Sequence, residues 1–163
     1  EDLGLSPISI AAKGQVITIT GSLFDGTGWA IRDAMIESWQ ADGAGLYAGQ
    51  VGADPNVSGF CRFAADKDTG EFILKTIKPG PVKNRDGKMM APHISLWIVA
   101  RGINIGLSTR VYFDDEDNSA DPLLVRIEQG PRVDSLIAKK TAAWQYRFDI
   151  RLQGQGETVF LDL

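Results

Sequence analysis

The 163-residue sequence predicts an all-β fold, a β-sandwich of mixed topology with long loops and at most two short helices. Three observations support this prediction. Apolar and polar residues alternate with period two along much of the chain. Sequences typical of turns separate the alternating segments. Features of a helix start are rare. Several short strands with regularly spaced turns are typical of a β-sandwich.

The first half of the chain is expected to contain four strands, at residues 15–24, 34–41, 60–65 and 71–77. The first ends at the turn sequence D-G-T-G, and the second ends at D-G-A-G. The third and fourth strands flank D-T-G, which predicts a hairpin. The following stretch, residues 78–87, is rich in Pro and Gly and is interpreted as a loop.

The second half is expected to contain four more strands, at residues 93–100, 109–113, 144–152 and 157–163. The segment 93–100 is apolar nearly throughout, as in a strand buried on both faces. In 144–152 the aromatic residues alternate with polar ones, which predicts a half-buried strand with Trp144 among its inward residues. Asp121, followed by Pro122, is a candidate cap for a short helix ending at Gly130. Residues 135–139 are a second candidate helical turn.

Length and composition indicate one domain over residues 1–163, because no linker or repeat divides the chain. The chain begins at Glu1 without a methionine or a signal peptide, so we expect an N-terminal segment to be missing. The net charge of −4 and the absence of a basic stripe argue against nucleic acid and anionic membranes as partners. No apolar run is long enough to span a bilayer. A single cysteine excludes an internal disulfide, and we expect a cytoplasmic location.

The single histidine, His93, limits the metal chemistry that the chain can support. Most non-haem iron and catalytic zinc sites use two or three imidazoles. A lone histidine at the start of an apolar strand is more often a hydrogen-bonded structural residue than a ligand. The acidic run 114–117 could bind a hard cation, but it lacks the spacing of a calcium loop and is interpreted as a solvated loop.

Three segments nevertheless form an ordered pattern: W-Q-A-D with G-L-Y at residues 39–47, T-I-K-P-G-P at 76–81, and A-P-H-I-S at 91–95. In this order and spacing they resemble the intradiol ring-cleaving dioxygenases, over about residues 14–163. Catalytic chains of that family hold ferric iron with two tyrosines and two histidines. A hard ferric ion favours anionic oxygen, which tyrosinate supplies.

The resemblance implies that this chain retains only half of those ligands. Tyr47 and His93 match the first tyrosine and the first histidine of the family motif. Val82 and Ser95 stand where the second tyrosine and the second histidine are expected. Met90 replaces an arginine of the catalytic chains, and Arg110 replaces a glutamine. We therefore expect no metal in this chain and a structural role for the two retained ligands.

The departures resemble one branch of the family, which cleaves 3,4-dihydroxybenzoate (protocatechuate) and pairs an iron-bearing β chain with a homologous iron-free α chain. The matching segments are M-A-P-H-I at 90–94, A-R-G-I-N at 100–104, V-Y-F-D-D-E at 111–116 and G-Q-G-E-T-V-F at 154–160. The resemblance implies Fe(III) in the partner chain, a higher hetero-oligomer of α–β protomers, and an aromatic acid substrate. It also implies that Arg101 binds substrate in the partner's pocket, where a guanidinium fits a carboxylate.

Two alternatives remain open from the sequence. A non-enzymatic β-sandwich, such as a transthyretin-like carrier or binding module, would need no metal and no partner, but it leaves the ordered segments unexplained. A self-sufficient catechol dioxygenase would explain the segments, but Val82 and Ser95 argue against it.

Overall fold

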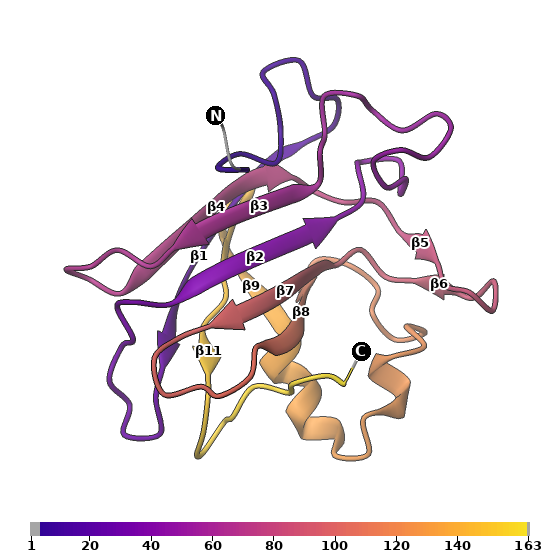
Figure 1. Cartoon of the computed structure of the whole chain (residues 1–163). Helices are drawn as coiled ribbons and strands as arrows, with labels where there is room; N and C mark the ends of the chain where they lie inside the picture. Colours follow the sequence, from indigo (N-terminus) through magenta and orange to yellow (C-terminus); the bar gives the residue numbers. More distant parts are fainter. Residues whose placement is uncertain (1–3, 163) are drawn as a thin grey trace.

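A computed structural model describes residues 4–162 and shows a chain whose regular secondary structure is mostly strands, joined by long loops (Figure 1). Helical structure in this part is limited to two 3-10 segments, η1 (Leu124–Arg126) and η2 (Gly130–Leu136). The strands are β1 (Val16–Phe24), β2 (Met35–Gln40), β3 (Phe60–Ala64), β4 (Glu71–Ile77), β5 (Val82–Lys83), β6 (Met89–Met90), β7 (Ile94–Val99), β8 (Leu107–Phe113), β9 (Ile137–Ala142), β10 (Gln145–Arg147) and β11 (Ile150–Arg151).

Nine of these strands form one mixed sheet in the order β11-β1-β10-β9-β8-β7-β2-β3, with β4 paired to β1. β1 runs parallel to β10 and β11, and β8 runs parallel to β9, whereas the other pairs are antiparallel. A tight turn joins β3, at one end of this path, to β4, so the sheet curls back on itself and nearly closes (Figure 1). The prediction of an all-β sandwich of mixed topology is confirmed.

Two apolar clusters fill the interior. The larger lies between the facing parts of the curled sheet and includes Ile19 of β1, Ile36 of β2 and Ile98 of β7. The alternation of buried and exposed residues along these strands explains why the period-two pattern predicted them. The smaller cluster centres on Tyr112 and Leu124, and it holds η1 against β8. This second cluster fixes the position of the candidate site described below.

The loop after β2 is pinned by a close approach of two backbone segments. Gly45 has a φ of 81°, and a Cβ atom added there would lie 2.1 Å from the carbonyl oxygen of Pro81. Only glycine accepts both this conformation and this contact. The contact holds the segment that carries Tyr47 beside the segment that carries Val82.

The structure corrects three of the predicted elements and adds one strand that was not predicted. Residues 78–87 are not entirely loop, because β5 lies within them and pairs with β6. The helix expected over 121–130 is only the single turn of η1, and Gly130 begins η2 instead. The predicted turn at 135–139 is the end of η2 and the start of β9. β9 escaped detection because its residues after Ala138 are all solvent-exposed, which removes the alternation.

The two last predicted strands are also corrected. Residues 144–152 form the two short strands β10 and β11, and Trp144 does not point inward: its φ is 60°, and it lies in the exposed turn before β10. Residues 157–162 form no continuous strand. Thr158 bonds to Arg151, and the N–H of Leu161 bonds to Ser108 on β8, so the segment crosses from one strand to another. Leu163, the end of the predicted strand, lies outside the described residues.

β7 was expected to be buried on both faces, but only one face is covered in the described structure. Ile94, Leu96 and Ile98 point into the core, whereas Trp97 on the opposite face is 40% exposed. The prediction was wrong because a run of apolar residues does not show whether each side chain is covered by the same chain or stays exposed on it.

Candidate functional site

The four positions that match the family's iron ligands lie around one end of β2, β7 and β8. Ser95 on β7 is directly opposite Trp39 on β2 and Arg110 on β8, so these side chains share the outer face of the sheet. Tyr47 follows β2, and its ring stacks on Trp39 with centroids 5.7 Å apart. Val82 lies on the β5–β6 hairpin.

His93 precedes β7 and is fully enclosed. Its Nδ1 atom lies 2.8 Å from the carbonyl oxygen of Ala91, so Nδ1 carries the proton and donates to that oxygen. Burial, together with the positive charge of Arg110, lowers the pKa of His93 from 6.5 to about 4. His93 is therefore neutral at pH 7, and its ring packs 5.6 Å from the ring of Tyr112.

Arg110 is the charge at the centre of this group. Its Nη1 atom donates to the sulfur of Met90 at 3.6 Å and to the hydroxyl of Tyr112 at 3.4 Å. Tyr112 in turn donates to the buried carboxylate of Asp121 at 3.2 Å. Asp121 also accepts the N–H groups of Leu123 and Leu124, but it is not the N-cap that the sequence predicted, because η1 begins at Leu124 and Leu123 is its N-cap. The guanidinium is thus held against η1 and β6.

These residues do not fit a ferric ion. Val82 has no lone pair to donate, and Ser95 offers only a neutral hydroxyl. Burial raises the pKa of Tyr47, and the positive charge of Arg110 offsets only part of this rise, so Tyr47 is a neutral phenol. A guanidinium beside the remaining donors repels a trivalent cation. The donor set supports the interpretation of Tyr47 and His93 as structural residues.

Arg101 is not brought together with these positions. It follows β7 at the end of the strand opposite to His93, and its side chain is 87% exposed. Its Nε atom lies 2.9 Å from the carboxylate of Asp33, a partner that sequence reasoning did not identify. The guanidinium therefore faces outward, where its remaining donors are accessible to another chain or to a ligand.

A groove that sequence reasoning missed opens beside Arg110. It has a volume of about 630 Å³, and its lining includes Arg85 of the β5–β6 hairpin and Arg126 of η1. No local sequence signal connects these three arginines, because they come from three elements that only the folded chain brings together.

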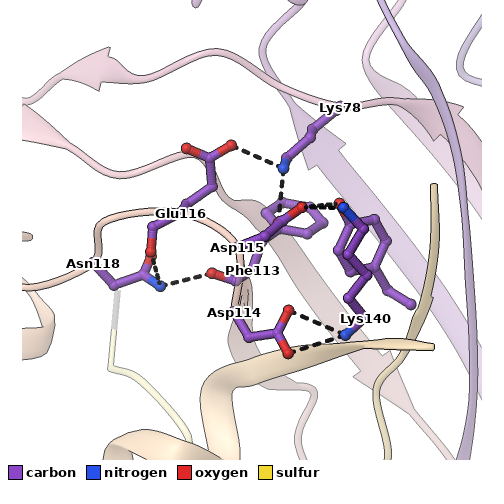
Figure 2. Close-up of polar contacts among 8 residues, drawn as sticks. Lys78, Phe113, Asp114, Asp115, Glu116, Asn118 and Lys140 are labelled. Carbon is purple, nitrogen blue, oxygen red and sulfur yellow. Dashed lines mark hydrogen bonds and ion pairs between the residues drawn. The ribbon is translucent and has the colours of Figure 1, made fainter. Parts of the chain in front are cut away.

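Residues 114–116 of the acidic run are part of a charged network rather than a freely solvated loop (Figure 2), whereas Asp117 bonds only to Ser119 among the residues that the structure describes. Asp115 accepts hydrogen bonds from Lys78 at 2.8 Å, from Lys140 at 3.0 Å and from the hydroxyl of Tyr146 at 2.9 Å. Lys78 also pairs with Glu116 at 2.8 Å. Burial raises the pKa of Asp115, but these hydrogen bonds outweigh it and lower the pKa to about 2. The network ties the loop after β8 to the residue that follows β4 and to β9 and β10.

Among residues 4–162, no helix has the length and apolar character needed to cross a membrane.

Comparison with known proteins agrees with this geometry. Residues 7–154 match the model of the Dioxygenase family, Dioxygenase_C. The chain is 48% identical to the protocatechuate 3,4-dioxygenase alpha chain of Pseudomonas putida, over 93% of this chain and 78% of that one. It is 31% identical to the protocatechuate 3,4-dioxygenase beta chain of Burkholderia cepacia, over 89% of this chain and 67% of that one.

Solved structures support the fold. The intradiol ring-cleavage dioxygenase of Tetranychus urticae matches 93% of this chain and 87% of its own, with a TM-score of 0.70 and 20% identity. Catechol 1,2-dioxygenase of Pseudomonas arvilla C-1 matches 93% of this chain and 56% of its own, with a TM-score of 0.69 and 19% identity. From its sequence match and its curled mixed sheet, the chain belongs to the Dioxygenase_C family, the intradiol dioxygenases.

Proposed function

We propose that this chain is the iron-free α-type subunit of a protocatechuate 3,4-dioxygenase. In the proposed reaction the bond between the two hydroxyl-bearing ring carbons of 3,4-dihydroxybenzoate breaks. Both atoms of O₂ enter the product, 3-carboxy-cis,cis-muconate. The ferric ion is held by a homologous β chain, with which this chain assembles into a larger oligomer of α–β protomers.

The observation that carries the proposal is the replacement of the metal site within a chain that otherwise matches α chains closely. Val82 and Ser95 stand at two ligand positions, and the Arg110 guanidinium lies among the rest. The identity to two alpha chains, 48% and 39%, exceeds the 31% identity to a beta chain. We also propose a cytoplasmic location, because a single cysteine allows none of the internal disulfides that are common in secreted domains.

We assign Arg101 the part of binding the ring carboxylate of the substrate in the partner's pocket. Its guanidinium is largely exposed, and one ion pair with Asp33 leaves most of its five donors free. A guanidinium binds a carboxylate with two parallel hydrogen bonds. This pair strengthens substrate binding and also fixes the orientation of the aromatic ring.

Co-expression with the homologous β chain tests the proposal. The two chains should co-purify, and uptake of O₂ with 3,4-dihydroxybenzoate should require the β chain. Iron content and the visible tyrosinate-to-iron absorption band should follow the amount of β chain present.

Two outcomes would contradict the proposal. An absorption band and turnover from this chain alone would indicate a self-sufficient dioxygenase. A well-folded chain that forms no complex with the β chain would favour the transthyretin-like binding or carrier module instead.

A further inference from the structure

The groove beside Arg110 combines positive charge with apolar walls. Arg85, Arg110 and Arg126 line it from the β5–β6 hairpin, β8 and η1. Apolar surface between them comes from Leu123, Ile127 and Leu161, among others. We call this groove the arginine pocket.

The three arginines of the pocket have no carboxylate partner among residues 4–162. Of the six other arginines, four form ion pairs within 4 Å in the same residue range: Arg62 with Glu37, Arg101 with Asp33, Arg132 with Glu157, and Arg147 with Glu71 and Asp149. Arg32 and Arg151 form none there, so the distinctive feature of the pocket is that it gathers three such arginines in one groove. Asp86 and Asp162 also line the pocket, but neither pairs with these guanidiniums. Three positive charges against two negative ones leave one net positive charge, which suits a monoanion.

Arg110 has unused hydrogen-bonding capacity. Its Nε atom is buried and has no hydrogen-bond partner in the described part of the chain. Its contacts to a thioether sulfur and a phenol oxygen are weak and leave other N–H groups free. A half-buried guanidinium satisfied so poorly favours an anionic acceptor, because charge-assisted hydrogen bonds are stronger than neutral ones.

The position of that guanidinium is fixed before any ligand arrives. Tyr112 is fully buried and connects Arg110 to the buried carboxylate of Asp121. Asp121 is itself held by the N–H groups of Ala91, Leu123 and Leu124. A preorganised donor loses little freedom on binding, which favours affinity.

We propose that the arginine pocket binds a small aromatic monocarboxylate. The carboxylate pairs with Arg110 and is approached by Arg85 or Arg126, while the ring lies against the apolar wall of Leu123, Ile127 and Leu161. Guanidinium planes also stack on aromatic rings, so the same arginines suit both parts of the ligand. This inference rests on the pocket alone and not on the proposed subunit role.

Ligand-observed fluorine NMR with 4-fluorobenzoate tests the proposal. Binding to the full chain should weaken by roughly tenfold to a hundredfold in Arg110→Met, which corresponds to the loss of a charge-assisted hydrogen bond. Arg126→Leu should weaken it severalfold, and it removes an exposed side chain without disturbing the core. Arg32→Leu is the matched control, since Arg32 is exposed and lies outside the pocket, and it should bind like the wild type.

Two further ligands separate the contributions of charge and ring. Benzamide keeps the ring but not the charge, and acetate keeps the charge but not the ring. Both should bind at least roughly tenfold more weakly than 4-fluorobenzoate, as each lacks one of the two recognised groups.

The proposal is overturned if 4-fluorobenzoate does not bind, if benzamide binds equally well, or if Arg110→Met and Arg126→Leu both bind like Arg32→Leu. In a complex with the β chain, 4-fluorobenzoate could also bind to the β chain. Only the binding that is lost in Arg110→Met and in Arg126→Leu is therefore assigned to the arginine pocket. The assay involves no turnover, so its failure and a failure of the proposed subunit role are distinguishable.

Discussion

Replacing Asp115 with asparagine should destabilise the chain measurably, because this carboxylate accepts three hydrogen bonds in the network of Figure 2. Asparagine preserves the shape of the side chain but removes its charge. Lys78, which is only 13% exposed, then keeps Glu116 as its one remaining anionic partner.

The magnitude follows from the pKa of Asp115. A carboxyl whose pKa falls from 3.8 to about 2 on folding stabilises the folded state by about 2 kcal/mol at neutral pH. The Asp115 side chain is 25% exposed, so solvent screening reduces this contribution to about 1–2 kcal/mol. For a chain of this length, that corresponds to a fall in Tm of about 2–8 °C.

The effect has a defined pH dependence. Because folding lowers the pKa of Asp115, its contribution is fully present above the unfolded pKa near 4 and is lost as the pH falls towards 2. The difference in stability between the wild type and Asp115→Asn should therefore be constant from pH 7 to pH 5 and should narrow below pH 4.

Thermal unfolding by circular dichroism measures this difference, at one protein concentration because association shifts Tm. Asp117→Asn is the matched control. Asp117 belongs to the same acidic run but bonds only to Ser119, two residues away. The reasoning is refuted if Asp115→Asn unfolds at the temperature of the wild type, or if Asp117→Asn lowers Tm by as much.

Three further predictions concern the candidate site. The double variant Val82→Tyr, Ser95→His should show no tyrosinate-to-iron absorption band when purified alone, because Arg110 still lies among the restored ligands; a strong band contradicts this. His93→Gln should flatten the fall in unfolding free energy between pH 6.5 and 4, since burial of neutral His93 contributes about 3 kcal/mol at most. Denaturant titrations across this range test it, and an unchanged slope assigns the fall to other groups. Arg101→Ala in the complex should lower kcat/KM for 3,4-dihydroxybenzoate by roughly tenfold to a hundredfold and that for catechol far less, with partial rescue by lysine. Equal slowing of both substrates assigns Arg101 to the interface or the fold.

The strands of the first half could be predicted because their burial follows from local alternation. Ile17, Ile19 and Leu74 point into the core at the period that their strands impose. The predictions failed where local sequence and tertiary environment diverge. β9 is polar because it is exposed, and Trp144 is aromatic yet lies in an open turn.

The candidate site shows the same division. Its individual positions could be found from short motifs, because Tyr47, His93 and Ser95 keep the family's spacing. The relation between positions could not be found in this way. Arg110 was recognised as a substitution, but its contact with Met90, its link through Tyr112 to Asp121 and its neighbours in the arginine pocket depend on elements distant in the sequence.

The link from Asp121 through Tyr112 to Arg110 has a consequence for how this chain could change over evolutionary time. Restoring a tyrosine at residue 82 or a histidine at residue 95 gains nothing while Arg110 repels the ion they would bind. Removing Arg110 first takes away the positive charge that is linked to the buried Asp121 carboxylate through the hydroxyl of Tyr112. A return to metal binding therefore needs coordinated changes at residues 82, 95 and 110, because no single substitution both supplies a ligand and removes the repelling charge.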